Sequence, residues 1–253
     1  LQGVHLTHGR AEWGGCVRVW PGGSVSVLDG LVTRCVAWAE DVEAKGGAMY
    51  VEGGLVELRR TTTADCSVVN IGDESAAGGA VFSLDSSLSL VDSTIANASA
   101  STSGSGTAFG GAVVSSRTNV SLVNATITHA HASATRDGRA QGGAVCSGDG
   151  SLSLVDSTIA NASASTSGSG TAHGGAVFSL RTNVSLVNST IAHAHASATG
   201  DGYAYGGAVF SQDSILSLID STIANASAST TGSGIAAGGA VYSGDGSLSL
   251  VDS

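Results

Sequence analysis

Large side chains, prolines and charges are all scarce in this chain. Aromatic residues make up 4% of the 253 positions, and the sequence contains one proline and four cysteines. A thick globular core is excluded, so any core must consist of valine, leucine, isoleucine and alanine. Charged residues account for 12%, and the net charge of −10 argues against nucleic acid as a partner.

Long apolar runs and metal-ligand spacings are missing as well. No stretch approaches the ~20 consecutive apolar residues of a membrane-spanning helix, so no membrane span is predicted in this segment. The cysteines show no C-x-x-C spacing, and we predict no cofactor. No signal peptide is recognisable at the start, and the chain starts and stops part-way through a repeat. We therefore expect a segment of a longer array, with its targeting signal and caps outside it.

Glycine, in contrast, is abundant, and its pairs recur at one fixed interval. The chain has 37 glycines, and Gly-Gly pairs begin at residues 14, 46, 78, 110, 142, 174, 206 and 238, each 32 residues after the last. Such a repeat is typical of a solenoid whose units pack only on their neighbours. We predict a single solenoid over residues 1–253, with irregular rungs in 1–77 and regular rungs of two alternating types in 78–253.

Within each repeat, apolar residues alternate with small polar ones, as in a strand with one buried face. Leu152 and Leu154 show this period, and so do Ala162 and Ala164. The pattern predicts an all-β parallel β-helix of about eight 32-residue rungs, with three short strands per rung. A leucine-rich repeat needs a longer leucine pattern, and a β-propeller blade needs more residues, so both fit less well.

Stacked rungs turn each repeat position into a column along the rod. Core columns are predicted for Val81, Ile95 and Ala98 and their equivalents. Because Ile95 and Ala98 are an odd number of residues apart, the chain must bend between them. The segment from Val36 to Lys45 falls where other repeats carry a Ser/Gly loop, and it is predicted to be a loop or a single turn. An outward apolar stripe is also expected. We predict that the Ser/Gly loop covers it, and the alternative is a sugar-stacking or partner surface. The stripe consists of Phe82, Val114, Cys146, Phe178, Phe210 and Tyr242.

The Gly-Gly-Ala-Val run, followed by Leu-Ser-Leu-Val-Asp-Ser-Thr-Ile, resembles the GGA[I/V] repeats of polymorphic outer-membrane proteins and autotransporter-like adhesins. The likeness covers residues 78 to 253 well and 14 to 77 loosely. The FxxN half of the family pattern is degenerate here and reads Ile159-Ala160-Asn161-Ala162. This resemblance implies a right-handed coil and a secreted or surface-exposed protein.

Two columns alternate between acidic residues and their partners. One column is predicted to be an alternating ion-pair ladder, because opposite charges on adjacent rungs attract; its alternative is a carboxylate row for sugar chemistry. A second column, from Asp92 through Asn124, predicts a hydrogen-bonded ladder at a turn. The ion-pair ladder consists of Asp85, Arg117, Asp149, Arg181 and Asp213.

Glycosylation sequons suggest a secreted glycoprotein, located outside the cell or at its surface. The strongest candidates lie where the neighbouring alanine column faces inward, and the weakest lie in the Asp92 column. In that order the candidate asparagines are Asn97, Asn161, Asn225, Asn119, Asn183, Asn124 and Asn188.

Histidines and cysteines offer two further candidates. The pairs His129/His131 and His193/His195 could each contact a metal ion, but the neighbouring columns supply no carboxylate, so solvated histidines are favoured. Cys35 and Cys66 are expected on adjacent rungs of one inward column, with Cα atoms ~5 Å apart, and we predict a disulfide between them. Cys16 and Cys146 would then be free thiols, unless Cys16 bonds outside this segment.

Near-identical rungs favour a structural or adhesive extracellular solenoid, a rigid glycosylated spacer or filament segment at a cell surface. Its partners would be copies of itself or neighbouring β-helix segments end to end, or cell-surface glycans or proteins. The alternative is a polysaccharide lyase or glycoside hydrolase, with its site in the irregular rungs or outside this segment. An ice-binding role would need a second threonine column beside that of Thr94. The irregular rungs hold the charged residues Glu12, Asp41, Glu43, Glu52, Glu57, Arg59, Arg60 and Asp65.

Overall fold

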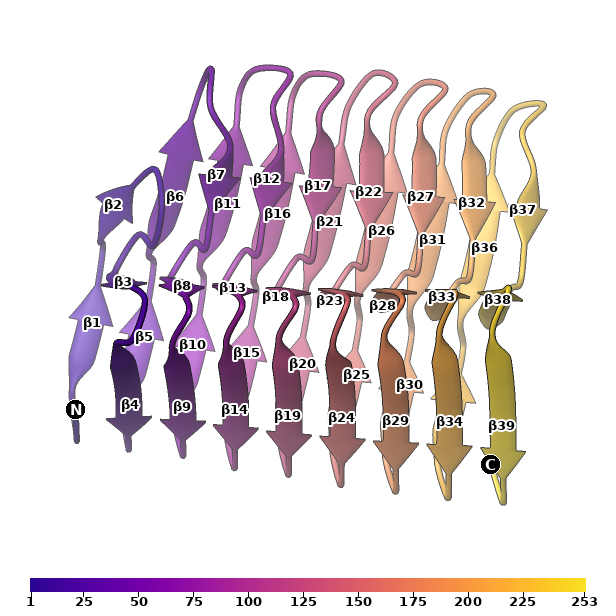
Figure 1. Ribbon diagram of the computed structural model, residues 1–253. Coiled ribbons are helices and arrows are strands. Elements are labelled where there is room, and N and C mark those ends of the chain that lie inside the picture. Colours follow the sequence, from indigo (N-terminus) through magenta and orange to yellow (C-terminus); the bar gives the residue numbers. More distant parts are fainter.

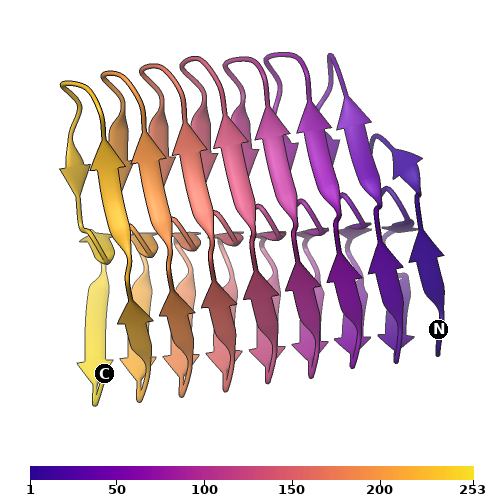
Figure 2. The ribbon, with the colours of Figure 1, turned by 180° about the vertical axis from the view of Figure 1, so that it is seen from behind.

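The computed structural model describes residues 1–253, which form a rod of stacked parallel strands without a helix (Figure 1). About seven turns stack along the rod, where about eight rungs were predicted, and each turn has the length of about 32 residues that the glycine interval predicted. In Figure 1 the chain descends on the near side and ascends on the far side while it advances from left to right. The coil is therefore right-handed, and Figure 2 shows the ascending strands from behind.

Each full turn contributes one strand to each of five parallel sheets, here named A to E. Sheet A contains β4 (Ser24–Leu28), β9 (Leu55–Arg59), β14 (Ser87–Val91), β19 (Asn119–Val123), β24 (Ser151–Val155), β29 (Asn183–Val187), β34 (Ile215–Ile219) and β39 (Ser247–Val251). Sheet B contains β1 (His5–Thr7), β5 (Leu31–Thr33), β10 (Thr62–Ala64), β15 (Thr94–Ala96), β20 (Thr126–Thr128), β25 (Thr158–Ala160), β30 (Thr190–Ala192) and β35 (Thr222–Ala224).

The other three sheets complete the coil. Sheet C contains β2 (Arg10–Ala11), β6 (Val36–Ala39), β11 (Ser67–Asn70), β16 (Ser99–Thr102), β21 (His131–Ala134), β26 (Ser163–Thr166), β31 (His195–Ala198) and β36 (Ser227–Thr230). Sheet D contains β7 (Ala44–Lys45), β12 (Ala76–Ala77), β17 (Thr107–Phe109), β22 (Arg139–Gln141), β27 (Thr171–His173), β32 (Tyr203–Tyr205) and β37 (Ala236–Ala237). Sheet E contains β3 (Val17–Val19), β8 (Met49–Glu52), β13 (Val81–Leu84), β18 (Val113–Ser116), β23 (Val145–Gly148), β28 (Val177–Leu180), β33 (Val209–Gln212) and β38 (Val241–Gly244).

Five strands per turn correct the prediction of three, and single-residue corners explain the difference. Asp85, Asp92 and Asn97 have φ angles of 49°, 50° and 51°, in the left-handed region that aspartate and asparagine tolerate better than most residues. Each corner ends a strand after only a few residues. The bend expected between the isoleucine and alanine columns lies at Asn97. The segment Val36 to Lys45 also differs from its prediction, because strands β6 and β7 occupy both of its ends.

The interior has two lobes of different width, with the narrow one above the wide one in Figure 1. The wide lobe lies between sheets A, B and E and is filled by columns that include Leu88, Leu90 and Ile95, all fully buried. The narrow lobe lies between sheets C and D, where buried alanines such as Ala132 and Ala140 form a separate cluster. Small side chains allow the two walls of the narrow lobe to approach closely.

The Gly-Gly pairs form the waist between the two lobes. Gly142 has a φ angle of 65°, which suits glycine. A Cβ atom on Gly143 would overlap the carbonyl oxygen of Gly175 on the next turn and the backbone of Ser163 on the opposite wall. The second glycine therefore lets the backbones of two walls touch, and the repeat marker seen in the sequence fixes the narrowest point of the coil.

Buried hydroxyl groups bond successive turns at the corners of the wide lobe. The Oγ atom of Ser157 donates to the carbonyl oxygens of Leu122 and Val155 at 3.2 and 2.8 Å, and accepts the N–H of Ala125 at 3.1 Å. Equivalent serines and threonines repeat this arrangement along the rod. These bonds satisfy buried backbone groups where the chain turns out of its sheets.

Candidate functional site

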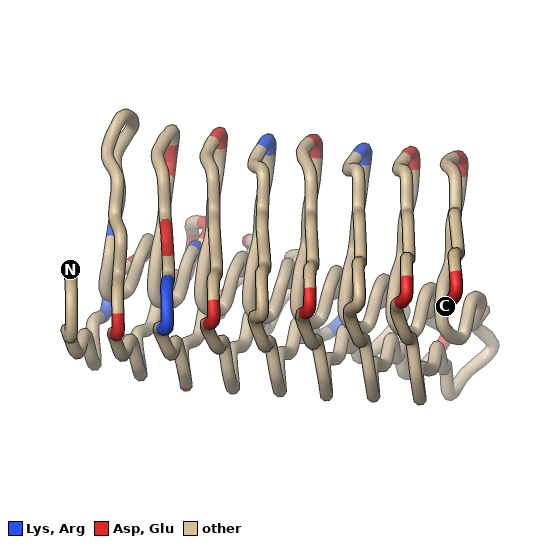
Figure 3. The backbone as a smooth tube through the Cα atoms, turned by 90° about the horizontal axis from the view of Figure 1, so that it is seen from below, with Lys and Arg blue, Asp and Glu red and all other residues tan.

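Ion pairs occupy one edge of the rod, where Figure 3 shows blue and red corners in alternation. Arg117 donates to both carboxylate oxygens of Asp85 at 2.6 and 2.8 Å, and Arg181 binds Asp149 in the same way at 2.6 and 3.0 Å. The hydrogen bonds from Arg117 lower the pKa of Asp85, and Asp85 raises the pKa of Arg117. Asp213 has no ion pair in this structure. The ion pairs thus join the turns two by two, and the predicted continuous ladder of charges is not formed.

Other polar columns bond turns with the same alternation. Asn124 donates to the carboxylate of Asp92 at 2.7 Å, within the same pair of turns that Arg117 and Asp85 join. Ser151 donates to Asn119 at 2.8 Å and therefore joins the next interface between turns. Both kinds of interface in the alternating repeat have their own side-chain bonds.

All seven sequon asparagines are exposed. Asn97, Asn161 and Asn225 lie at the corner between sheets B and C, and Asn119 and Asn183 begin strands of sheet A. Asn124 and Asn188, the weakest candidates, belong to a column that is exposed rather than buried, so burial does not exclude these sequons. Both lie at the corner between sheets A and B.

The histidine pairs lie on the outer surface and contact their neighbours on the next turn. His131 Nδ1 is 2.8 Å from Ser163 Oγ, and His129 Nε2 is 3.4 Å from Asn161 Nδ2. Burial, with a smaller contribution from His129, lowers the pKa of His131. No cluster of three or more histidine, cysteine, aspartate or glutamate side chains is present that could hold a metal ion.

The disulfide joins Cys16 to Cys35, with Cα atoms 5.5 Å apart, so the predicted Cys35–Cys66 bond is wrong. Cys35 and Cys66 do stack on adjacent turns, since the strands on both sides of them pair in that register. The sequence reasoning missed the waist, where Gly15 packs against the backbone of Val36 and brings Cys16 close to Cys35 across the coil. Cys66 stays a buried thiol, and burial raises its pKa to about 11.

Several charged residues of the irregular turns have partners nearby. Arg59 is 3.3 Å from Glu57, and Arg60 binds Asp29 at 2.6 Å. The Tyr50 hydroxyl donates to Glu52 at 3.2 Å, and Lys45 pairs with Glu43. Each of these contacts joins one acid to a basic or hydroxyl group, and none brings two carboxylates together.

An aromatic corner runs along the outside of the rod where sheet D meets sheet E. We define it by two facing columns, one at the end of sheet D and one in sheet E. The stripe in sheet E is buried although it points outward: Phe82, Phe178 and Phe210 are 6–7% exposed. Phe109 and Tyr205 of the facing column in sheet D cover this stripe, together with other side chains of sheet E. The expectation that the Ser/Gly loop covers the stripe is wrong, because that loop lies at the far tip of the narrow lobe (Figure 1).

The facing column was not recognised in the sequence, although its signal is simple. Its residues immediately precede each Gly-Gly pair, and they vary in size. His173 belongs to it and packs edge-on against Phe210, with ring centroids 4.5 Å apart. Its Nδ1 atom is buried without a hydrogen-bond partner. Burial, with a smaller effect of Arg139, lowers the pKa of His173 to about 4.

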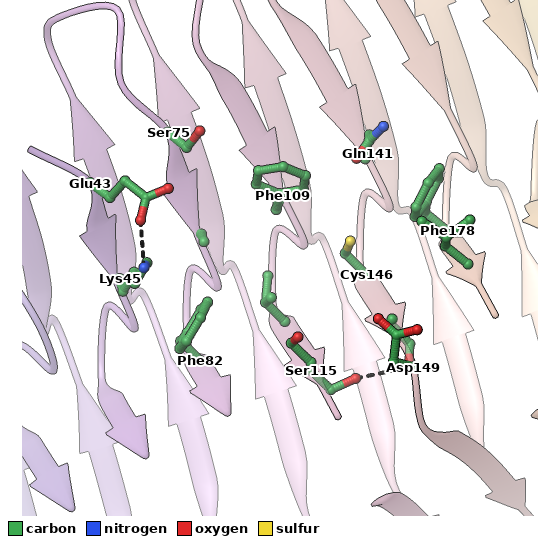
Figure 4. A pocket seen from close by; sticks show the side chains of 16 residues that line it. Glu43, Lys45, Ser75, Phe82, Phe109, Ser115, Gln141, Cys146, Asp149 and Phe178 are labelled. Carbon is green, nitrogen blue, oxygen red and sulfur yellow. Dashed lines mark hydrogen bonds and ion pairs between the residues drawn. The ribbon is translucent and has the colours of Figure 1, made fainter. Parts of the chain in front are cut away.

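Two hollows interrupt the aromatic corner. The first, of ≈ 370 Å³, extends from Lys45 and Phe82 past Gln141 and Cys146 to Phe178, and Figure 4 shows these side chains around it. The second, of ≈ 280 Å³, is lined by His173, Tyr205, Phe210, Gln212, Tyr242, Gly244 and Asp245. The corner thus brings large apolar groups and polar groups together along the rod.

These features define a parallel β-solenoid with an aromatic outer corner and exposed sequon asparagines. No protein-family model matches the chain, and no curated protein or solved structure is significantly similar to it. The structure contains no helix that is long and apolar enough to cross a membrane.

Proposed function

We propose that this chain is a rigid extracellular spacer, part of a structural or adhesive protein at a cell surface. The observation that carries the proposal is the equivalence of the regular turns. From Gly78 onward, successive turns repeat the same core columns and the same corners. An enzyme needs one turn that differs from its neighbours, whereas a spacer needs only length.

Rigidity follows from the way adjacent turns are joined. Backbone ladders run through all five sheets, and buried hydroxyl groups reinforce the corners. Ion pairs such as Arg117–Asp85 and hydrogen bonds such as Ser151–Asn119 fall at alternate interfaces. A slip of one turn would bring unlike partners together, so these bonds favour a single register.

The exposed sequons support an extracellular location. The sequon asparagines lie along the corners and the start of sheet A, on the outside of the rod. Sugars attached there would leave the core and the aromatic corner free. The resemblance to polymorphic outer-membrane proteins and autotransporter-like adhesins supports the same location. Suitable partners are other copies end to end, neighbouring β-helix segments, or glycans and proteins of a cell surface.

The experiment is expression of the chain, preceded by a secretion signal, in eukaryotic cells. We expect secreted protein carrying glycans at several of the seven sequons, measured by glycopeptide mass spectrometry. Asn→Gln variants at Asn161 and Asn225 should lower the mass stepwise without changing the melting temperature. Retention inside the cell, or secreted protein without glycans, would contradict the proposal. Cleavage of a uronate or neutral polysaccharide by the purified chain would instead support the lyase or hydrolase alternative.

A further inference from the structure

Each turn brings one side chain of sheet D and one of sheet E to the same level of the aromatic corner. Ring contacts between the two columns, such as His173 with Phe178 at 5.9 Å, show that they meet. Every level carries at least one aromatic ring except the level of Gln141 and Cys146. In chain order the rings are Trp13, Tyr50, Phe82, Phe109, His173 with Phe178, Tyr205 with Phe210, and Tyr242.

The rings of sheet E form parallel stacks on both sides of this gap. Tyr50 and Phe82 stack at 5.4 Å with an angle of 1° between their planes, and Phe178 and Phe210 stack at 5.2 Å with an angle of 0°. Each stack stops where the column continues with a smaller side chain. Phe82 and Phe178 therefore each have one face without a stacked ring in their own column.

The larger hollow lies at this interruption. Its volume of ≈ 370 Å³ exceeds the ~150 Å³ of a protein cavity that binds benzene. Phe109, Cys146 and Phe178 supply apolar walls, and Gln141 supplies a side-chain amide at the same level (Figure 4). That amide has no hydrogen-bond partner within the protein, so both its N–H and C=O groups remain free for a ligand.

We propose that the level of Gln141 and Cys146 binds a planar aromatic small molecule with a hydrogen-bonding substituent, such as a phenol. Its ring takes the place of the missing ring, between Phe109 and Phe178, and its hydroxyl group bonds to the amide of Gln141. Stacked or edge-to-face contacts would hold the ring. A saturated sugar fits less well, because several hydroxyl groups would face the apolar walls without partners. This site goes beyond the proposed spacer function and does not depend on it.

The test is a fluorescence titration of the purified chain with 2-naphthol. We expect saturable binding to one site with a Kd below about 1 mM. Cys146→Phe puts a ring into the gap, as Phe178 and Phe210 do on later turns, and should weaken binding at least about ten-fold. Gly239→Ala is the control, since Gly239 lies outside the hollow and a Cβ atom there meets nothing within 4 Å, and it should bind like the parent chain. Absent saturation, or equal Kd values for parent and Cys146→Phe, would overturn the site.

A second variant tests the polar contact. Gln141→Leu keeps the size of the side chain but removes its amide, so 2-naphthol should lose about five-fold in affinity. 2-Methylnaphthalene, which has no hydroxyl group, should bind both proteins equally. If Gln141→Leu lowered the affinity for both compounds to the same extent, or for neither, the role of Gln141 would be overturned. Melting curves of each variant show whether the coil is intact.

Discussion

The wide and the narrow lobe of each turn are stabilised by different means. In the wide lobe, large side chains such as Leu90 and Ile95 remove much apolar surface from water. In the narrow lobe, alanines such as Ala132 fill a space so thin that backbone packing and interstrand hydrogen bonds carry more of the stability. The waist glycines couple the two, because their missing side chains set the distance between the walls. Each turn thus combines a hydrophobic core in the wide lobe with close backbone packing at the waist and in the narrow lobe.

The largest expected effect is at the waist. Gly143→Ala places a methyl group onto the carbonyl of Gly175 and the backbone of Ser163, neither of which can move without separating the turns. We expect a loss of more than about 4 kcal/mol in the free energy of unfolding. Gly148→Ala on the same turn should change it by less than about 0.5 kcal/mol. Chemical denaturation measures both, and equal losses would mean that the waist is no closer than the outer face.

The two lobes should also respond to opposite changes in volume. Ile159→Ala leaves a cavity in the wide lobe and should cost about 2–5 kcal/mol. Ala164→Leu overfills the narrow lobe and should cost about 1–3 kcal/mol or more. Conversely, an unchanged denaturation midpoint for Ala164→Leu would show that the walls of the narrow lobe can separate easily.

The disulfide reinforces the waist of the first turn. The Cys16→Ser, Cys35→Ser double variant should lose about 3 kcal/mol, since the bond closes a loop of 19 residues. Cys66→Ala should keep the bond and lose less. Alkylation under denaturing conditions without reduction should label Cys66 and Cys146 only. A label on Cys35 would contradict the Cys16–Cys35 pair.

Outside both lobes, His173 makes the aromatic corner sensitive to acid. Its folded-state pKa of about 4 lies below the ordinary value of 6.5, so the unfolded chain binds the proton more readily. The resulting loss of stability begins as the pH falls below about 6.5 and levels off below about pH 4, at about 3 kcal/mol. His173→Phe should remove this part of the pH dependence. If the free energies of unfolding of parent and variant fell in parallel between pH 7 and 4, the assigned role of His173 would be contradicted.

The smallest effect is expected at the exposed ion pairs. Asp85 has a lowered pKa because Arg117 bonds to its carboxylate, so the pair stabilises the fold above the ordinary aspartate range. That contribution is lost as the pH falls through the lowered folded-state pKa. Melting temperatures of parent and Arg117→Gln should differ slightly at neutral pH and converge once the pH has fallen below the lowered pKa of Asp85. A difference that persists in strong acid would point to the backbone of the corner instead.

Repetition made most of the fold predictable. The glycine interval gave the length of the turn, and the columns of Val81, Ile95 and Ala98 proved to be core. The number of strands was missed because only one of the phase shifts in the sequence was used. The inward residues Leu90 and Ile95, on either side of the corner at Asp92, are also an odd number of residues apart. Only the odd spacing between Ile95 and Ala98 was read as a bend, and it lies at Asn97.

Contacts across the coil were harder to predict than contacts along it. A repeat indicates which residues stack on adjacent turns, and it placed Cys35 beside Cys66 correctly. It contains no information on the distance between opposite walls, which is why the Cys16–Cys35 bond was missed. The second column of the aromatic corner was missed for the same reason. It belongs to another sheet and faces the first column only after the chain turns at the glycines.

Deletion of residues 142–205, one pair of turns, tests the central claim that length is what the repeat provides. The deletion joins Gln141 to Gly206 and keeps every column and the alternation in phase. Small-angle X-ray scattering should show a rod shortened by about 10 Å with an unchanged cross-section. A changed cross-section or an unfolded chain would show that the turns are not interchangeable, and would contradict the proposed spacer function.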